Sequence, residues 1–265
     1  MRGFKIAVAG KGGVGKTLIA GSLARLLSRD GYKVLAIDAD PAMNLHRQLG
    51  IDSGRVEVVK PILEDSKLID ERTNIGSGFL LLTPRVDDII ERYGVKGMDD
   101  VILVRLGTIR YGGSGCMCPA NALLRALLSY ILLSRDEAVV VDLEAGLEPL
   151  GRGTVEAVDL LLSVAEPTSQ SIDTCRRIAK LALDLGLKKV SYIVNKVTED
   201  VDIESIEYSL GSPIIAAIPF DRSVIEAERL GVPLLDYAPN SVAAEALKNL
   251  KDRVRDLIEG GVGYG

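Results

Sequence analysis

The sequence has little of what marks several classes of protein. Its 265 residues include only 3 cysteines and no tryptophan, and 32 Lys and Arg stand against 37 Asp and Glu, for a formal net charge of -5. So few cysteines argue against a disulfide framework and favour a reducing compartment. The absence of a basic excess argues against a general nucleic-acid binder.

Long hydrophobic runs are also missing. The longest, residues 122–133, is interrupted by Arg125 and is shorter than a bilayer-spanning helix. The opening MRGFKIAVAG has no apolar stretch of the kind that forms a signal peptide. We therefore expect a cytoplasmic protein with neither a membrane nor a nucleic acid as its partner.

Short apolar runs alternate with helix-length segments along the chain. Strands are expected at 4–9, 33–38, 78–83, 101–106, 138–142, 160–165, 190–195 and 214–218, and helices at 15–29, 121–134, 168–185 and 241–258. Strands without polar alternation, separated by helices, are typical of an α/β, doubly wound, mostly parallel sheet with helices on both faces. Residues 1–259 are expected to form one domain, and 260–265 a flexible tail.

A glycine-rich segment follows the first expected strand and opens the first helix. Residues 10–17, GKGGVGKT, match the phosphate-loop pattern G-x-x-x-x-G-K-[ST] in the context that this pattern requires. Backbone N–H groups at a helix N-terminus hold phosphate, while Lys16 would reach the β- and γ-phosphates and Thr17 would ligate Mg²⁺. The expected nucleotide-binding residues here are Gly12, Gly13, Val14, Gly15, Lys16, Thr17 and Leu18.

Lys11 is a second lysine inside this loop. The string resembles the deviant Walker A of the P-loop ATPase family that includes MinD, ParA, the nitrogenase iron protein and the arsenite and tail-anchored-protein ATPases. The resemblance implies an ATP-dependent homodimer in which Lys11 reaches the partner's nucleotide. There it would neutralise developing charge as an arginine finger does.

Three aspartates follow expected strands, where open parallel sheets bind their ligands. By resemblance to the family, Asp40 orients the attacking water, Asp38 lies near the Mg²⁺ shell, and Asp142 is the Walker B aspartate on Mg²⁺. Gly146 matches the glycine of switch II, which Asp142 opens. A helix cap or turn role stays open for each carboxylate, and more so for Asp38.

The nucleotide base is expected between two later loops. Asn195 and Lys196 end one strand, and Pro219, Phe220 and Asp221 follow the next. GTPases continue the first motif to an aspartate that accepts from guanine, but Thr198 stands at that position. The chain should therefore bind ATP rather than GTP, with Asn195 pairing with adenine.

Cys116 and Cys118 lie in the glycine-rich string GGSGCMCP. Pro119 suits a first helical turn, which places Cys118 near a helix N-terminus, where thiolate is favoured. Two thiolates do not complete a zinc site, and the only histidine, His46, is a poor local ligand. A two-fold dimer would supply four, so a Cys₄ site for Ni²⁺ or Zn²⁺ on the dimer axis is expected. Incidental loop thiols are the alternative.

This string, with DLEAGLE at 142–148 and GRGT at 151–154, resembles the CooC-type carbon monoxide dehydrogenase maturation ATPases, a family implicated in nickel insertion. The resemblance implies a metallochaperone-type dimer whose client is apo-carbon monoxide dehydrogenase. One departure is Pro149, where we expect many relatives to carry histidine.

Other functions stay open. A MinD/ParA-like positioning ATPase would need a basic amphipathic helix, but charges of both signs are mixed over 245–259 and the apolar stripe there suits core packing. A tail-anchored-protein ATPase needs a Met-rich insertion, and only 4 Met are present. An iron–sulfur reductase would have widely separated cluster cysteines. A nucleotide-gated switch with little turnover also remains. Cys175 is expected to be an inert packing residue.

Overall fold

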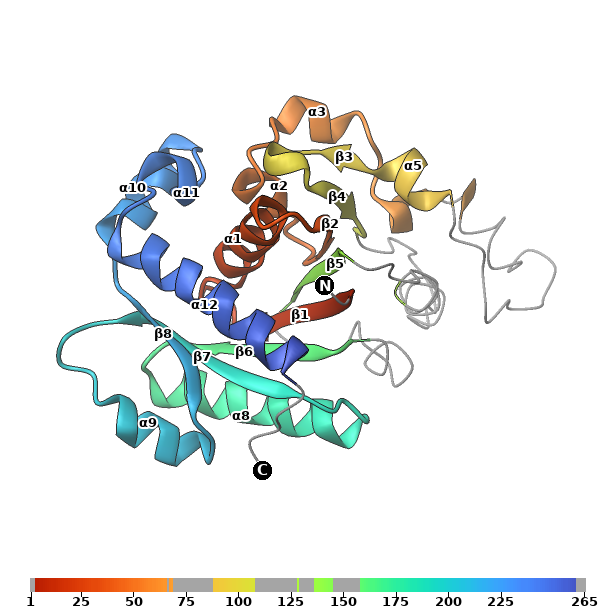
Figure 1. The fold of residues 1–265 in the computed structure, drawn as a ribbon. Helices are drawn as coiled ribbons and strands as arrows, with labels where there is room; N and C mark the ends of the chain where they lie inside the picture. Colours follow the sequence, from red (N-terminus) through yellow and green to blue (C-terminus); the bar gives the residue numbers. More distant parts are fainter. Residues whose placement is uncertain are drawn as a thin grey trace.

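The centre of the molecule is an eight-stranded sheet in the order β3-β4-β2-β5-β1-β6-β7-β8 (Figure 1). A computed structural model describes residues 3–65, 67–68, 88–107, 128, 136–144 and 158–260. The strands are β1 (Phe4–Gly10), β2 (Lys33–Ala39), β3 (Val95–Lys96), β4 (Ile102–Arg105), β5 (Glu137–Leu143), β6 (Leu160–Ala165), β7 (Val190–Val197) and β8 (Ile214–Pro219).

The predicted parallel sheet is confirmed. Neighbouring strands in the described residues run parallel, except that β3 pairs with β4 in the antiparallel sense. β1 and β5 are wholly buried at the centre except for Glu137, which is half-buried. A strand buried on both faces needs no polar alternation, which explains the continuous apolar runs in the sequence. The strand predicted at 78–83 lies outside the described residues.

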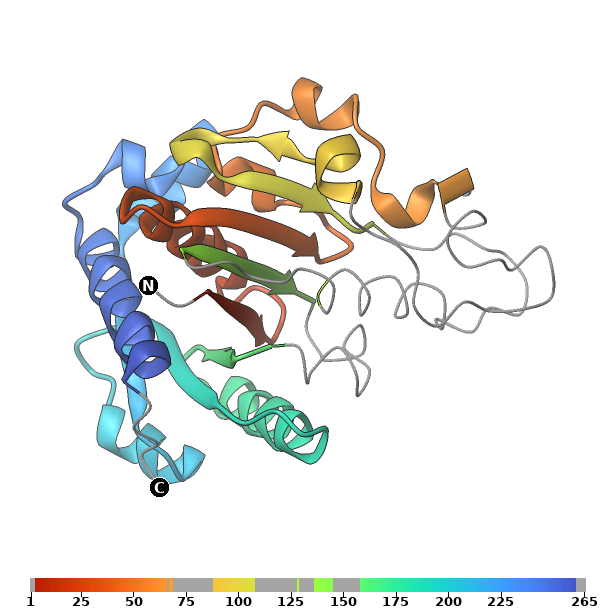
Figure 2. The same cartoon turned by 45° about the vertical axis from the view of Figure 1, so that its right-hand side comes forward.

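Helices cover both faces of the sheet (Figures 1 and 2). On one face α1 (Lys16–Arg29) and α12 (Val242–Glu259) pack against residues such as Ala138 and Val140, whereas α8 (Ser169–Asp184) lies on the other. These three helices were predicted; the one expected at 121–134 lies outside the described residues apart from Leu128. The other helices in the described residues are α2 (Leu45–Gln48), α3 (Ser53–Glu57), η1 (Ile62–Glu64), α5 (Ile89–Tyr93), η3 (Met98–Asp100), α9 (Ile203–Leu210), α10 (Arg222–Leu230) and α11 (Leu234–Tyr237).

The apolar stripe of α12 belongs to the core, as predicted. Leu247, Leu250 and Val254 have no exposed surface, and Lys248, Lys251 and Arg255 of the same helix are paired with carboxylates. Lys251, for example, lies 2.6 Å from Asp30 and 2.8 Å from Asp252. Within the described residues, none of the helices combines the length and apolar character needed to cross a bilayer.

A buried arginine ties the first helix to two distant segments. Arg25 of α1 is 1% exposed, and its guanidinium donates to Asp99 of η3 at 2.7 Å and to Asp236 of α11 at 2.8 Å. Planar guanidinium groups make such paired bonds with carboxylates, which keeps the buried charge compensated. The helix that begins at the phosphate loop is thereby fixed against both sides of the molecule.

Candidate functional site

The glycine loop predicted to bind phosphate connects the end of β1 to the start of α1. Gly13 and Gly15 have φ angles of 82° and 96°, in the left-handed region that glycine adopts at little cost. A Cβ on Gly15 would lie 2.3 Å from Nδ2 of Asn195, and one on Gly10 would lie 2.2 Å from the carbonyl oxygen of Val164. These glycines are required because β7 and β6 approach the loop closely.

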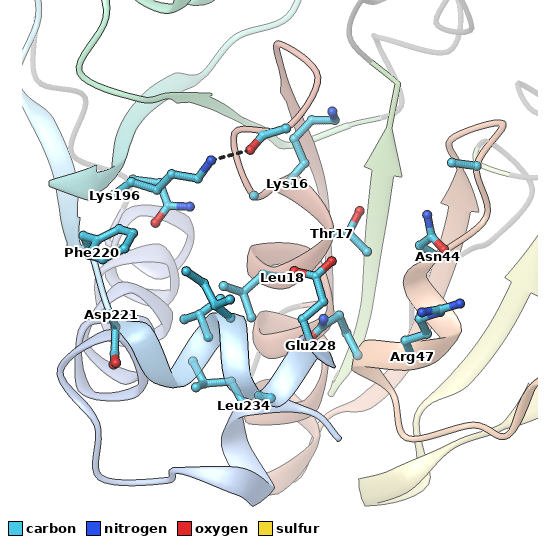
Figure 3. A pocket seen from close by; sticks show the side chains of 18 of the residues that line it. Lys16, Thr17, Leu18, Asn44, Arg47, Lys196, Phe220, Asp221, Glu228 and Leu234 are labelled. Carbon is cyan, nitrogen blue, oxygen red and sulfur yellow. Dashed lines mark hydrogen bonds between the residues drawn. The ribbon is translucent and has the colours of Figure 1, made fainter. Parts of the chain in front are cut away.

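A pocket of about 720 Å³ opens over this loop (Figure 3). It combines the loop with the segment after β2 and with the segments after β7 and β8, three regions that the sequence predicted separately. Its lining consists of Gly12, Gly13, Gly15, Lys16, Thr17, Leu18, Asp40, Ala42, Asn44, Arg47, Gln48, Asn195, Lys196, Pro219, Phe220, Asp221, Val224, Ile225, Ala227, Glu228, Gly231, Val232 and Leu234. Val14, in contrast, is fully buried in the core.

Thr17 and Asp142 meet at the floor of the loop. The Thr17 hydroxyl donates to Oδ2 of Asp142 at 2.6 Å, and the buried Oδ1 of Asp142 has no hydrogen-bond partner in the described part of the chain. Burial raises the pKa of Asp142 to about 7, although the Thr17 hydrogen bond acts to lower it. An unpartnered carboxylate oxygen beside a hydroxyl fits a hard divalent cation or a water bound to it.

Asp38 and Asp40 have different surroundings. Asp38 is fully buried, and its two oxygens accept from the backbone N–H groups of Asp40 at 3.3 Å and of Leu45 at 3.0 Å. Burial and then the charge of Asp142 raise the pKa of Asp38 to about 8. Asp38 therefore anchors the turn that presents Asp40, which favours the turn role that the sequence left open. Asp40 itself lines the pocket and accepts from Ala42 N–H at 2.9 Å.

The two loop lysines point to different places. The Lys16 side chain is buried, and its Nζ lies 3.4 Å from the carbonyl oxygen of Lys11. The Nζ of Lys11 instead donates to the side chain of Gln170, in the first turn of α8, at 2.8 Å. Lys16 is thus turned into the pocket, whereas Lys11 is held at its outer side.

The residues expected around the base all line the pocket, but their polar groups have partners of their own. Asn195 donates to the Val14 carbonyl at 2.7 Å. The oxygens of Asp221 accept from Ser223 N–H at 2.8 Å and from Ala243 N–H at 3.1 Å, so this carboxylate caps α10 and fixes the start of α12. Phe220 is 46% exposed, so part of its side chain is available for stacking.

Helix α10 supplies pocket residues that the sequence reasoning missed. Figure 3 shows Glu228 of α10 within the pocket and Arg47 of α2 at its opposite edge. A signal was present, because Asp221 caps the start of α10 and Gly231, with φ 69°, ends it. An aspartate and a glycine ten positions apart around an amphipathic stretch are helix boundary signals.

Three predicted site residues, Cys116, Cys118 and Gly146, lie outside the described residues. Cys175 is fully buried, with Sγ 3.0 Å from the Ser163 hydroxyl, and burial raises its thiol pKa to about 11. A thiol so rarely ionised is an inert packing residue, as predicted. His46 is also buried, with Nδ1 2.9 Å from the carbonyl oxygen of Met43.

Comparison with known proteins identifies relatives of this site. The profile of the CobQ/CobB/MinD/ParA nucleotide binding domain matches residues 5–234. The carbon monoxide dehydrogenase accessory protein CooC from Rhodospirillum rubrum is 45% identical over 241 residues, which are 89% of this chain and 91% of that protein. An uncharacterized ATP-binding protein from Methanocaldococcus jannaschii is 44% identical over 238 residues, covering 87% of this chain and 91% of the relative.

Solved structures share the fold. The cell division ATPase MinD from Pyrococcus furiosus superposes with a TM-score of 0.71 at 24% identity, covering 97% of this chain and all of that one. MinD from Pyrococcus horikoshii, solved with Mg-ADP, gives a TM-score of 0.70 at 22% identity, covering 98% of this chain and 99% of that one.

Proposed function

Because this chain belongs to the CobQ/CobB/MinD/ParA nucleotide-binding family and is similar to CooC, we propose that it is an ATPase, which hydrolyses ATP to ADP and phosphate as a magnesium-dependent homodimer. The contact between Thr17 and Asp142 carries the proposal. The Thr17 hydroxyl bonds to Oδ2 of Asp142 at 2.6 Å, whereas the buried Oδ1 of Asp142 has no partner among the described residues. That arrangement supports a hydrated Mg²⁺ beside a bound triphosphate.

Each residue of the loop has a separate task in this proposal. The backbone N–H groups from Gly12 to Thr17 and the N-terminus of α1 hold the phosphates. Lys16 neutralises charge on the β- and γ-phosphates, and Asp40, held by Asp38, orients the attacking water. Mg²⁺, held by Thr17 and Asp142, supplies charge neutralisation at the phosphate oxygens. Lys11 acts on the nucleotide of the partner subunit.

Adenine is the base that the pocket favours. Thr198 follows Asn195 and Lys196 where an acidic acceptor for guanine would be needed. The exposed part of Phe220 and the apolar side chains of α10 offer a stacking surface that does not itself choose between purines. The absence of an acidic acceptor for guanine therefore favours ATP over GTP.

The CooC relative supports a specific client. An identity of 45% over most of both chains supports a role as an accessory ATPase of carbon monoxide dehydrogenase. We propose that Cys116 and Cys118 of two subunits together hold Ni²⁺ or Zn²⁺ as cargo, and that ATP binding and hydrolysis close and reopen this dimer. Apo-carbon monoxide dehydrogenase would receive the metal.

Metal stoichiometry, mass in solution and ATP turnover test this function together. Wild type should form a dimer with a non-hydrolysable ATP analogue and bind one metal ion per dimer. Cys116→Ser/Cys118→Ser should lose that ion while keeping ATP turnover, and Cys175→Ala is the matched control for removal of a thiol. Equal metal binding by the double serine variant would refute the cysteine site.

Two further outcomes separate the alternatives. Asp40→Ala should abolish hydrolysis; if wild type shows no turnover but client binding still follows the nucleotide, the protein is a nucleotide-gated switch. A positioning ATPase would sediment with liposomes or DNA in an ATP-dependent way. The paired basic side chains of α12 argue against that result.

A further inference from the structure

We propose that Glu166 is a positioning residue for the phosphate loop and acts through Lys196. This inference rests on the proposed ATP-binding function and concerns how the loop is organised for phosphate. It also changes the task of Lys196, which the sequence assigned to the base.

Lys196 has an unusual backbone and a specific contact. Its φ angle is 61°, a left-handed conformation that costs a non-glycine residue free energy and persists only where the surroundings enforce it. Its Nζ donates to the carbonyl oxygen of Gly13 at 2.7 Å, the bond drawn as a dashed line in Figure 3. The strained backbone thus directs the side chain onto the loop.

Glu166 is placed to hold that ammonium group. It follows the last residue of β6, the strand that lies between β1 and β7 in the sheet. Its Oε2 is 3.2 Å from Nζ of Lys196, and its carboxylate is more buried than the lysine, with exposed fractions of 25% and 44%. The backbone N–H of Glu166 donates to the hydroxyl of Ser171, which is fully buried at the start of α8. The position of Glu166 is therefore fixed by the packed interior.

The contact matters because the C=O and N–H of one peptide point in opposite directions. When Lys196 holds the Gly13 carbonyl, the Val14 N–H of the same peptide faces the other way, into the loop, where it lies 3.4 Å from the carbonyl oxygen of Lys11. Asn195 holds the next carbonyl, that of Val14, at 2.7 Å, which orients the Gly15 N–H in turn. Consecutive residues of β7 thus fix consecutive peptides of the loop, and it is such N–H groups that bind phosphate.

The two possible tasks of Lys196 predict different ligand dependence. A lysine that contacts the base contributes equally to the binding of AMP, ADP and ATP, and it influences the ratio of ATP to GTP affinity. A lysine that orients loop peptides contributes only where phosphates occupy the loop. Its removal should therefore weaken the binding of ADP and ATP but scarcely affect the binding of AMP. The ratio of ATP to GTP affinity should not change.

The test is calorimetric titration of the full-length protein with AMP, Mg-ADP, Mg-ATP and Mg-GTP. Lys196→Met should lower the affinity for Mg-ADP and Mg-ATP about tenfold and the affinity for AMP less than about twofold. Glu166→Gln should show the same pattern with a smaller loss, and the double variant should bind no more weakly than Lys196→Met. Lys196→Arg, which keeps the charge, should recover part of the affinity.

Matched controls remove the same charges elsewhere. Lys188→Met, exposed before the start of β7, and Glu199→Gln, exposed three residues after Lys196, should bind like wild type. Equal losses for AMP and ATP, a changed ATP to GTP ratio, or additive losses in the double variant would overturn the proposal. If wild type binds neither Mg-ADP nor Mg-ATP, the proposed function itself fails. Glu166→Gln keeps the test available if Lys196→Met does not fold.

Discussion

The hydroxyl of Thr17 lies 2.6 Å from Oδ2 of Asp142, and this bond joins the first turn of α1 to the end of β5. It satisfies one oxygen of a fully buried carboxylate and leaves the other unpartnered among the described residues. A buried charge in this state lowers stability. The protein therefore carries a local cost that a bound cation would remove, which links folding to ligand binding.

Asp142→Asn should accordingly stabilise the metal-free protein while damaging the site. We expect the free energy of unfolding in EDTA at pH 8 to rise by about 1–2 kcal/mol, because the substitution removes a buried charge that Thr17 and Lys16 only partly offset. The extra stability that Mg-ADP gives wild type should disappear. Denaturant unfolding with and without Mg-ADP measures both effects. Asp184→Asn, at the exposed end of α8, should change neither, and a less stable Asp142→Asn protein would contradict the argument.

The effect of replacing a loop glycine by alanine on stability should depend on the space around that glycine. Gly15→Ala places a Cβ 2.3 Å from Asn195 Nδ2 at a φ of 96°, whereas a Cβ on Gly12 meets nothing within 4 Å. Gly15→Ala should lower the free energy of unfolding by about 1–3 kcal/mol and abolish ATP binding. Gly12→Ala should unfold like wild type, and it serves as a control for folding only. Equal unfolding curves for both variants would show that the approach of β7 does not constrain the loop.

The buried ion pairs of Arg25 should matter for stability in a pH-dependent way. Arg25→Met leaves Asp99 and Asp236 without their buried partner and should cost about 3 kcal/mol at pH 7. Arg29→Met, whose side chain is 37% exposed, should cost less than about 1 kcal/mol.

The pH dependence follows from Asp99. Burial acts to raise its pKa, but hydrogen bonds from Arg29 and Arg25 bring the net pKa below 3.8. A carboxyl group with a lowered folded-state pKa contributes stability above its unfolded pKa and loses it as the pH falls through the folded one. The difference between wild type and Arg25→Met should therefore shrink below about pH 4. A constant difference from pH 7 to pH 3 would rule out this coupling.

The sequence predicted the sheet because the apolar residues of each central strand are neighbours along the chain. Residues 138–141 form an unbroken apolar run and residues 160–165 form one interrupted only by Ser163, and they coincide with the central strands β5 and β6. Strand β3 has only two residues, Val95–Lys96, which is too short for any periodicity to register. Helix α10 fully buries only Ala227, but its amphipathic pattern and its caps, Asp221 and Gly231, could have identified it.

The contacts that organise the site depend on side-chain directions across the sheet. A motif identifies Lys16 and Thr17, because the phosphate loop is one continuous segment. The bond from Lys196 to Gly13 joins residues 183 positions apart, and no spacing rule connects them. The same holds for Lys11 and Gln170, which are 159 positions apart. The sequence therefore supplied the chemical groups, and the fold determined which of them touch.

Gln170 should restrain Lys11, the lysine that we propose to act across the dimer. In the isolated chain Lys11 donates to Gln170 at 2.8 Å, and Lys11 must leave this partner to act on the nucleotide of a second subunit. An exposed hydrogen bond of this kind is worth about 0.5–1 kcal/mol. Because a two-fold dimer would release two such bonds, Gln170→Ala should strengthen ATP-dependent dimerisation by about five- to thirtyfold, measured by analytical ultracentrifugation with a non-hydrolysable ATP analogue. ATP affinity of the monomer should not change.

Lys11→Met tests whether Gln170 acts on dimerisation through Lys11. It should keep the ATP affinity of the monomer and lose both ATP-dependent dimerisation and hydrolysis, whereas Lys16→Met should lose ATP binding as well. Adding Gln170→Ala to Lys11→Met should produce no gain, because the restrained group is already gone. If Gln170→Ala still strengthens association in the Lys11→Met background, the glutamine acts at the interface itself, and the hydrogen bond between Lys11 and Gln170 has no part in controlling assembly.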